Sequence, residues 1–149
     1  MMRKLPADRI YLLMALSAGV VGKVTFAMSA IYRVQVVGLD VFQLVFLGTV
    51  LEASVFLFEI PTGVVADVYS RRLSVIIGIA MMGAGFMFEG LFPLYGTVLL
   101  AQVIWGIGWT FVSGAQSAWI TDEVGVEKAG NLFLSGRQVL QVGNLVGIA

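Results

Sequence analysis

The sequence predicts an all-α fold, a polytopic bundle of transmembrane helices, from three observations. First, hydrophobic residues make up 59% of the 149 residues and charged residues only 12%, whereas a soluble domain carries about 25% charged residues. Second, apolar segments recur at the length of about 20 residues that a helix needs to cross the hydrocarbon core of a bilayer. Third, the connections between these segments are short, and none is long enough to hold a soluble domain.

Four apolar segments have spanning length, and a fifth runs to the last residue: 10–32, 41–66, 73–92, 96–120 and 129–149. The first segment follows basic residues, so 10–22 also has the pattern of a signal peptide. Apolar sequence resumes after Lys23, however, and the whole stretch reaches spanning length. Because the last segment is still apolar where the sequence stops, we expect residues 1–149 to be a fragment of a longer membrane protein.

The distribution of Lys and Arg predicts the orientation. Short cytoplasmic loops carry an excess of these residues. On one predicted side lie the connection between the first two segments and the connection at 93–95, with Arg33 as their single basic residue. On the other side lie the amino terminus and the remaining connections. These contain six basic residues: Arg3, Lys4, Arg9, Arg71, Arg72 and Lys128. We therefore expect a multi-pass protein of the cell membrane with a cytoplasmic amino terminus and the lipid bilayer as its surroundings.

Composition also excludes several classes of function. The chain has no Cys and no His, which removes the commonest ligands of metal sites and the usual nucleophile–base pairs. A formal net charge of zero gives no reason to expect nucleic acid as a partner. We therefore expect no cofactor, no metal and no enzymatic activity.

Ionisable residues inside the predicted spans are the first candidates for function, because a charge at the centre of a membrane helix costs at least about 2.5–3.5 kcal/mol. At about 1.5 Å rise per residue, Lys23 and Glu52 fall near mid-depth and form a candidate pair on the substrate or ion path. Glu59 and Arg137 lie nearer the cytoplasmic surface and form a second candidate pair. The alternative is that these charges only lock neighbouring helices together. Glu89, near the outer end of its span, is expected to be interfacial.

The fourth predicted helix carries a polar and aromatic stripe at helical spacing: Trp105, Trp109, Ser113 and Gln116. Such a stripe can line a substrate path with stacking surfaces and an amide, or it can pack between helices, and both interpretations stay open. Gly78, Gly83 and Gly85 in the third helix are expected to be close-packing sites.

The segment Glu59-Ile-Pro-Thr-Gly63-Val-Val-Ala-Asp67-Val-Tyr-Ser-Arg71-Arg72 is the most specific motif. Its pattern Gly63-x-x-x-Asp67-x-x-x-Arg71-Arg72 resembles the cytoplasmic loop between helices 2 and 3 of major facilitator superfamily transporters. The family pattern is roughly Gly-x-Leu-Ala-Asp-Arg-x-Gly-Arg-Arg, and this chain has Val, Val and Ser where the family has Leu, Arg and Gly. The lead-in Glu-Ile-Pro-Thr-Gly resembles that of bacterial drug-efflux members.

The resemblance covers all 149 residues as the first four helices and part of a fifth, and it implies an incomplete amino-terminal half of a transporter whose carboxy-terminal half is missing. It also implies a role for several residues. Asp67, Arg71 and Asp122 would form a charge cluster that latches one conformation, and Gly63 would allow a helix of the missing half to approach closely. This chain departs from two family patterns. The segment Gln102-Val-Ile-Trp-Gly106-Ile-Gly108 lacks the Arg that the family ties to proton coupling. The segment 143–148 has Ile in place of a Pro that is typical of drug–proton antiporters.

The function that the resemblance implies is secondary active transport of a small-molecule substrate, with efflux of a drug-like or amphipathic compound by alternating access as the leading expectation. The alternative is a small helical membrane scaffold or interaction protein without transport activity, in which the glycine faces assemble the helices and every charge is structural.

Overall fold

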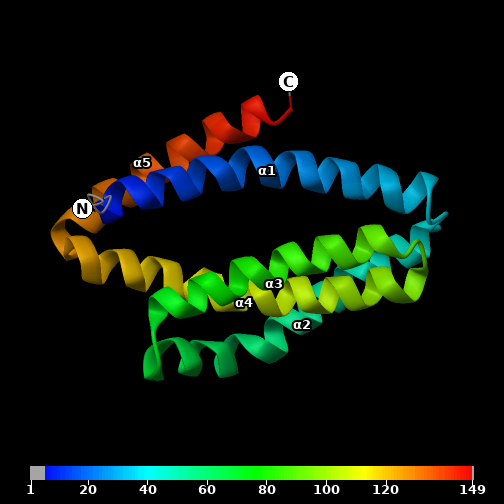
Figure 1. Ribbon diagram of the computed structural model, residues 1–149, viewed down its shortest axis with the longest axis horizontal. Coiled ribbons are helices and arrows are strands. Elements are labelled where there is room, and N and C mark those ends of the chain that lie inside the picture. The colour runs from blue at the N-terminus through cyan, green and yellow to red at the C-terminus, as the bar shows by residue number, and fades with distance from the viewer. Residues whose placement is uncertain (1–5, 149) are drawn as a thin grey trace. The chain divides into compact units, whose positions relative to one another are not determined.

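The computed structural model describes residues 6–148, and five α-helices account for almost all of them (Figure 1). In chain order they are α1 (Ala7–Gln35), α2 (Val41–Val68), α3 (Arg71–Leu91), α4 (Tyr95–Val124) and α5 (Val126–Val146). The first four are long and apolar enough to cross a membrane, judged by length and composition. The all-α class predicted from the composition and the span lengths is therefore confirmed.

The helices extend further than the apolar segments. Thr121–Lys128 was expected to be a loop, yet α4 continues to Val124 and α5 begins at Val126 instead of near Ala129. The two helices are separated only by Gly125, whose φ of +83° is a left-handed conformation that favours glycine. Polar side chains do not end a helix once it leaves the hydrocarbon, so the apolar length underestimates the helical length.

The connection between α2 and α3 is also shorter than expected. Arg71 and Arg72 occupy the first turn of α3, which leaves only Tyr69 and Ser70 between the helices. The Ser70 hydroxyl accepts a hydrogen bond from the Leu73 N–H at 3.3 Å and so caps the start of α3. This cap determines where α3 begins and therefore where its two arginines lie.

A capping box determines the start of α2. The Asp40 carboxylate accepts the Gln43 N–H at 2.8 Å, and the Gln43 side-chain oxygen accepts the Asp40 N–H at 3.0 Å. Just before it, Gly38 makes the turn with a φ of +74°. Leu39 is thereby held in a small core with Leu47 and Val98.

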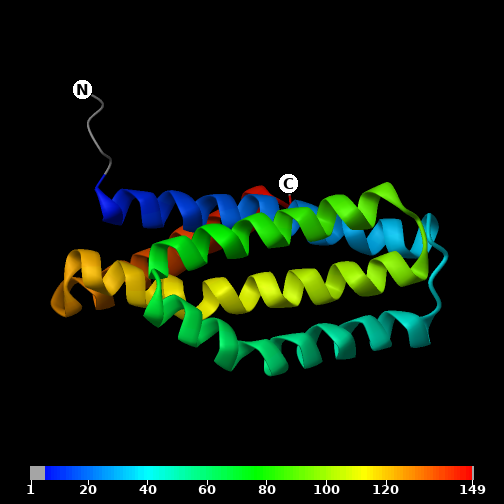
Figure 2. The same ribbon diagram turned by 60° about the horizontal axis from the view of Figure 1, so that its bottom comes forward.

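Pro61 lies inside α2 and lacks the N–H that would continue the helical hydrogen bonding. The buried hydroxyl of the next residue, Thr62, lies 2.8 Å from the Phe58 carbonyl oxygen and 3.2 Å from that of Glu59. The helix bends in its second half (Figure 2), as expected where a proline interrupts the hydrogen-bond ladder. The bend lies shortly before the segment that carries Gly63 and Asp67.

The described residues divide into two compact units. Unit 1 consists of residues 6–31 and 120–148, and unit 2 is Tyr32–Trp119. The body of α1, the last turn of α4 and α5 therefore belong to unit 1. The last turn of α1, the helices α2 and α3, and most of α4 belong to unit 2.

Glycines bring the backbones of α1 and α5 together in unit 1, where the two helices run side by side (Figures 1 and 2). A Cβ added at Gly19 would lie 2.5 Å from the Leu140 carbonyl oxygen, and one added at Gly143 would lie 2.6 Å from the Leu16 carbonyl oxygen. No side chain fits at such distances. Close backbone approach through small residues is a usual way for membrane helices to associate.

Unit 2 uses the same principle between α3 and α4. A Cβ at Gly78 would lie 2.5 Å from the Gly108 carbonyl oxygen, and one at Gly108 would lie 2.8 Å from the Gly78 oxygen. The buried Ser74 hydroxyl donates to the Phe111 carbonyl at 2.9 Å across the same seam. Gly85 also contacts α4, so the packing role predicted for Gly78 and Gly85 is confirmed. Within the described residues, Gly83 has no neighbour within 4 Å of an added Cβ.

Candidate functional site

Two members of the predicted charge cluster meet across the connection between α2 and α3. Asp67 lies in the last turn of α2 and Arg71 in the first turn of α3, and an Arg71 guanidinium nitrogen (Nη2) lies 3.3 Å from the Asp67 Oδ1. The Arg71 Nε lies 3.4 Å from the same oxygen. Both side chains are exposed to solvent, so this ion pair contributes little stability, on the order of 0–1 kcal/mol.

The third predicted member, Asp122, lies in the last turn of α4, which belongs to unit 1. Its participation in the cluster stays a prediction. The same holds for Gly63, where an added Cβ would meet nothing within 4 Å among the described residues. The backbone of α2 is therefore open at this position.

The four deep charges are divided between the units. Lys23 and Arg137 belong to unit 1, whereas Glu52 and Glu59 belong to unit 2. All four side chains are exposed, and among the described residues none has an ion-pair partner within its own unit. Each of these four charges therefore has no oppositely charged partner among the described residues of its own unit. The pairings of Lys23 with Glu52 and of Glu59 with Arg137 stay predictions.

The aromatic part of the α4 stripe forms a stack. The Trp105 and Trp109 rings are parallel within 5°, with their centroids 5.8 Å apart. Phe86 of α3 meets Trp105 edge-on, with 6.4 Å between the centroids. Trp105 therefore takes part in packing between α3 and α4, and Trp109 extends its stack with a ring that is 43% exposed. Of the lower part of the stripe, Ser113 and Gln116 are partly buried.

The two glycines of the segment 102–108, Gly106 and Gly108, contact different helices. A Cβ at Gly106 would lie 3.0 Å from the Ser54 Cβ on α2, whereas Gly108 contacts Gly78 on α3. Residues two apart on a helix point about 200° away from each other. The spacing Gly-x-Gly thus lets α4 approach α2 with one side and α3 with the other.

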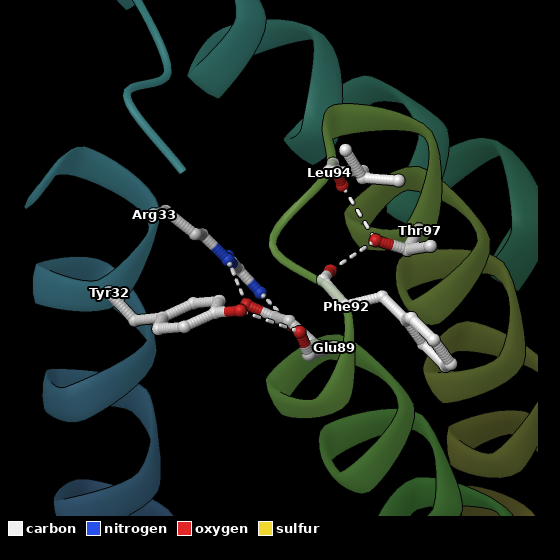
Figure 3. A network of polar contacts seen from close by, with 6 residues as sticks. All are labelled: Tyr32, Arg33, Glu89, Phe92, Leu94 and Thr97. Carbon is white, nitrogen blue, oxygen red and sulfur yellow. Dashed lines mark hydrogen bonds and ion pairs between the residues drawn. The ribbon is translucent and has the colours of Figure 1, made fainter. Parts of the chain in front are cut away.

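Arg33 and Glu89 form a largely buried ion pair in unit 2 (Figure 3). The Arg33 guanidinium donates to both Glu89 carboxylate oxygens, at 2.7 and 2.9 Å. The Tyr32 hydroxyl donates to the Glu89 backbone carbonyl at 3.1 Å. A bidentate arginine–carboxylate pair is among the strongest polar contacts in proteins. It joins the last turn of α1 to the last turn of α3.

This pair is not among those predicted from the sequence. Arg33 bears only on the predicted topology, and Glu89 is expected to be interfacial, whereas the Glu89 side chain is only 3% exposed. The feature of the sequence that could have indicated the pair is that Arg33 and Glu89, a base and an acid, lie on the same predicted side of the membrane. The partners are 56 residues apart, and they meet because the last turn of α1 lies against the last turn of α3 within unit 2.

Residues 6–148 contain no group of three or more His, Cys, Asp or Glu side chains that could hold a metal ion.

Thr97 makes a further polar contact at this end of unit 2 (Figure 3). Its hydroxyl lies 2.5 Å from the Phe92 carbonyl oxygen and 2.7 Å from that of Leu94, and it ties down the turn that leads into α4.

Comparison with known proteins agrees with the fold and the motif. The chain is 26% identical over 108 residues to an uncharacterized MFS-type transporter, YxaM, of Bacillus subtilis (strain 168), an alignment that covers 72% of this chain and 27% of the relative. The chain thus spans about a quarter of that relative's length. No solved structure matches the chain significantly. The family model of the Major Facilitator Superfamily matches residues 2–148, and the chain belongs to this superfamily of membrane transporters.

Proposed function

We propose that the protein containing this chain is a secondary active transporter that exports a drug-like or amphipathic compound by alternating access. The observation that carries the proposal is the set of four deep charges without an ion-pair partner in their own unit: Lys23, Glu52, Glu59 and Arg137. Charges in membrane helices face a water-filled cavity or a partner and mark substrate or ion paths. Membership of a transporter superfamily supports the same conclusion.

The mechanism that fits this family plan is rocking of one half of the transporter around a mid-membrane site. Lys23 and Glu52 would offer charges of both signs to that site, and Trp109 an exposed aromatic ring on which an apolar compound can stack. Asp67 and Arg71 already form a pair at the α2–α3 connection, and with Asp122 they would latch one conformation. Gly63 leaves the backbone of α2 open to a helix of the carboxy-terminal half.

The second candidate is a helical membrane scaffold that does not transport. The close glycine contacts between helices and the ion pair between Arg33 and Glu89 are compatible with a scaffold, because both hold helices together. The deep charges separate the two candidates, since a scaffold needs them only as structural pairs.

A double-mutant cycle on Lys23 and Glu52 in the full-length protein tests the proposal. Each single variant leaves the other charge of the proposed pair without its counter-charge inside the membrane, which is costly, so Lys23→Met and Glu52→Gln should each reduce expression or activity. For a pair on the transport path, the double variant regains folding but does not export ethidium, a fluorescent cationic dye, from intact cells. Glu127→Gln in the first turn of α5 is the control for loss of one charge.

Full export of the dye by the double variant would contradict the transport-path role. It would leave Lys23 and Glu52 as packing charges and move the search for the site to Trp109 and Gln116. Absence of export by the unmodified protein, for ethidium and for a panel of amphipathic dyes, would contradict drug efflux. Folding must be checked in each case by size-exclusion chromatography, because a protein that is not inserted cannot report on transport.

A further inference from the structure

Unit 1 contains an open cavity of about 610 Å³, and none of its lining residues belongs to the predicted transport path. They come from the first turn of α1 and the residue before it, the last turn of α4 and the first turns of α5. These helix ends lie at one end of the unit (Figure 1). Ligand pockets in proteins typically have volumes of about 300–1,000 Å³. The cavity therefore has the size of a small-molecule site.

The polar lining of the cavity comes from all three helices. Asp8 belongs to α1, Glu123 to α4 and Lys128 to α5, and Asn131 and Ser135 follow on α5. The Ser135 hydroxyl donates to the backbone carbonyl of Asn131 at 3.0 Å, and this bond does not involve the side-chain amide of Asn131. Val124 and Leu132 add apolar surface.

The charges around the cavity do not neutralise one another. Among the described residues, neither Asp8 nor Glu123 makes an ion pair with Lys128, although all three line the same cavity. Within residues 6–148, the lining of the cavity thus carries two carboxylates and one ammonium. An occupant with a positive and a negative group would satisfy both signs at once.

The geometry points to a binding site for a small zwitterion, a molecule with an ammonium group and a phosphate or carboxylate group a few bonds apart. The ammonium group lies between Asp8 and Glu123, the acidic group contacts Lys128, and the Asn131 amide donates a further hydrogen bond. This site goes beyond the proposed transport function, because none of its residues belongs to the predicted path. Its occupancy can be measured without any transport.

The test is binding of glycerophosphoethanolamine, whose phosphodiester and ammonium groups carry one charge each, to the purified full-length protein, measured by isothermal titration calorimetry. Dimethyl phosphate and ethylamine each carry only one of these two charges, and each should bind at least about tenfold more weakly, because one charge-assisted contact is lost. Lys128→Gln and Glu123→Gln should each weaken binding of glycerophosphoethanolamine by about tenfold or more for the same reason. Asp8→Asn, on a different helix, is a third variant with the same expectation.

Glu127→Gln is the matched control, since Glu127 is an exposed acid next to Lys128 that does not line the cavity. Unchanged binding by this variant supports the site. Equal binding of the zwitterion and its two halves, or equal losses in Glu127→Gln and Glu123→Gln, would overturn it. All variants lie at exposed helix ends, and their folding is checked by size-exclusion chromatography.

A zwitterion of this kind can be a soluble molecule or a phospholipid headgroup, and the lipid composition distinguishes the two. The protein is reconstituted in vesicles of phosphatidylglycerol with or without phosphatidylethanolamine. Weaker binding of glycerophosphoethanolamine in the presence of phosphatidylethanolamine supports the site with a headgroup as its occupant. Equal affinity in both vesicles supports the site with a soluble occupant.

Discussion

The ion pair of Arg33 and Glu89 shows how the burial of a charged residue depends on its partner. A carboxylate that is 3% exposed at the end of an apolar helix is stable as an ion only when a cation and hydrogen bonds replace the lost water. Arg33 supplies both through its bidentate contact. The pair also holds the end of α1 against α3, close to the loop that leads into α2.

Glu89→Gln should destabilise the protein strongly, because it leaves the mostly buried Arg33 guanidinium without its counter-charge. Loss of one partner of a buried pair costs about 3–5 kcal/mol. Arg33→Gln should have a similar effect, and the double variant should lose less than the sum of the two. Thermal unfolding of the full-length protein in detergent, followed by tryptophan fluorescence, measures all three.

Tyr32→Phe is the control for this cycle. It removes only the hydrogen bond from the Tyr32 hydroxyl to the Glu89 carbonyl, which is worth about 0.6 kcal/mol on average in a membrane protein. Additive losses in the single and double variants of Arg33 and Glu89 would show that the two charges do not act as a pair.

Glycine position decides packing at the scale of the helix. Gly78 and Gly83 lie on the same helix, but only Gly78 meets the backbone of α4. On α4 itself, Gly106 and Gly108 serve two different neighbours. Abundant glycine in the sequence therefore indicates close packing in general, whereas the contact that each glycine makes depends on how its helix is rotated.

Gly78→Ala should destabilise the protein, because its new Cβ would lie 2.5 Å from the Gly108 carbonyl oxygen and force α3 and α4 apart. Overpacking of this kind typically costs about 1–3 kcal/mol. Gly83→Ala, on the same helix with open space around it, should be neutral or slightly stabilising. The midpoint of thermal unfolding and the monodisperse fraction in size-exclusion chromatography compare the two. Equal destabilisation by both variants would contradict the seam.

Orientation in the membrane is a property of the whole molecule. The basic residues in the first turn of α3 and in the first turn of α5 predict that these ends face the cytoplasm, whereas the α1–α2 and α3–α4 connections face outward. The 149 residues contain no Cys, so a single introduced Cys reports the side on which it lies. Tyr69 and Val36 are both exposed and lie in opposite predicted compartments.

In intact cells, a membrane-impermeant thiol reagent should label Val36→Cys and leave Tyr69→Cys unlabelled. Both variants should be labelled after the cells are permeabilised, which shows that each thiol is accessible. The unmodified full-length protein gives the background from any Cys outside this chain. Labelling of Tyr69→Cys in intact cells would reverse the predicted orientation and with it the cytoplasmic position of Asp67 and Arg71.

The sequence by itself determined the fold class, the order of the helices and the family motif around Gly63, Asp67 and Arg71, because apolar length and loop charge are local properties of the chain. It underestimated α4 and α5, since Thr121, Asp122 and Glu123 are polar yet helical. Only the tertiary structure decided that Arg33 pairs with Glu89, that Gly106 and Gly108 face different helices, and that Asp8, Glu123 and Lys128 share a cavity. These contacts depend on the rotation and offset of helices that are distant in the chain, and apolar patterns with charges at their ends do not encode either quantity.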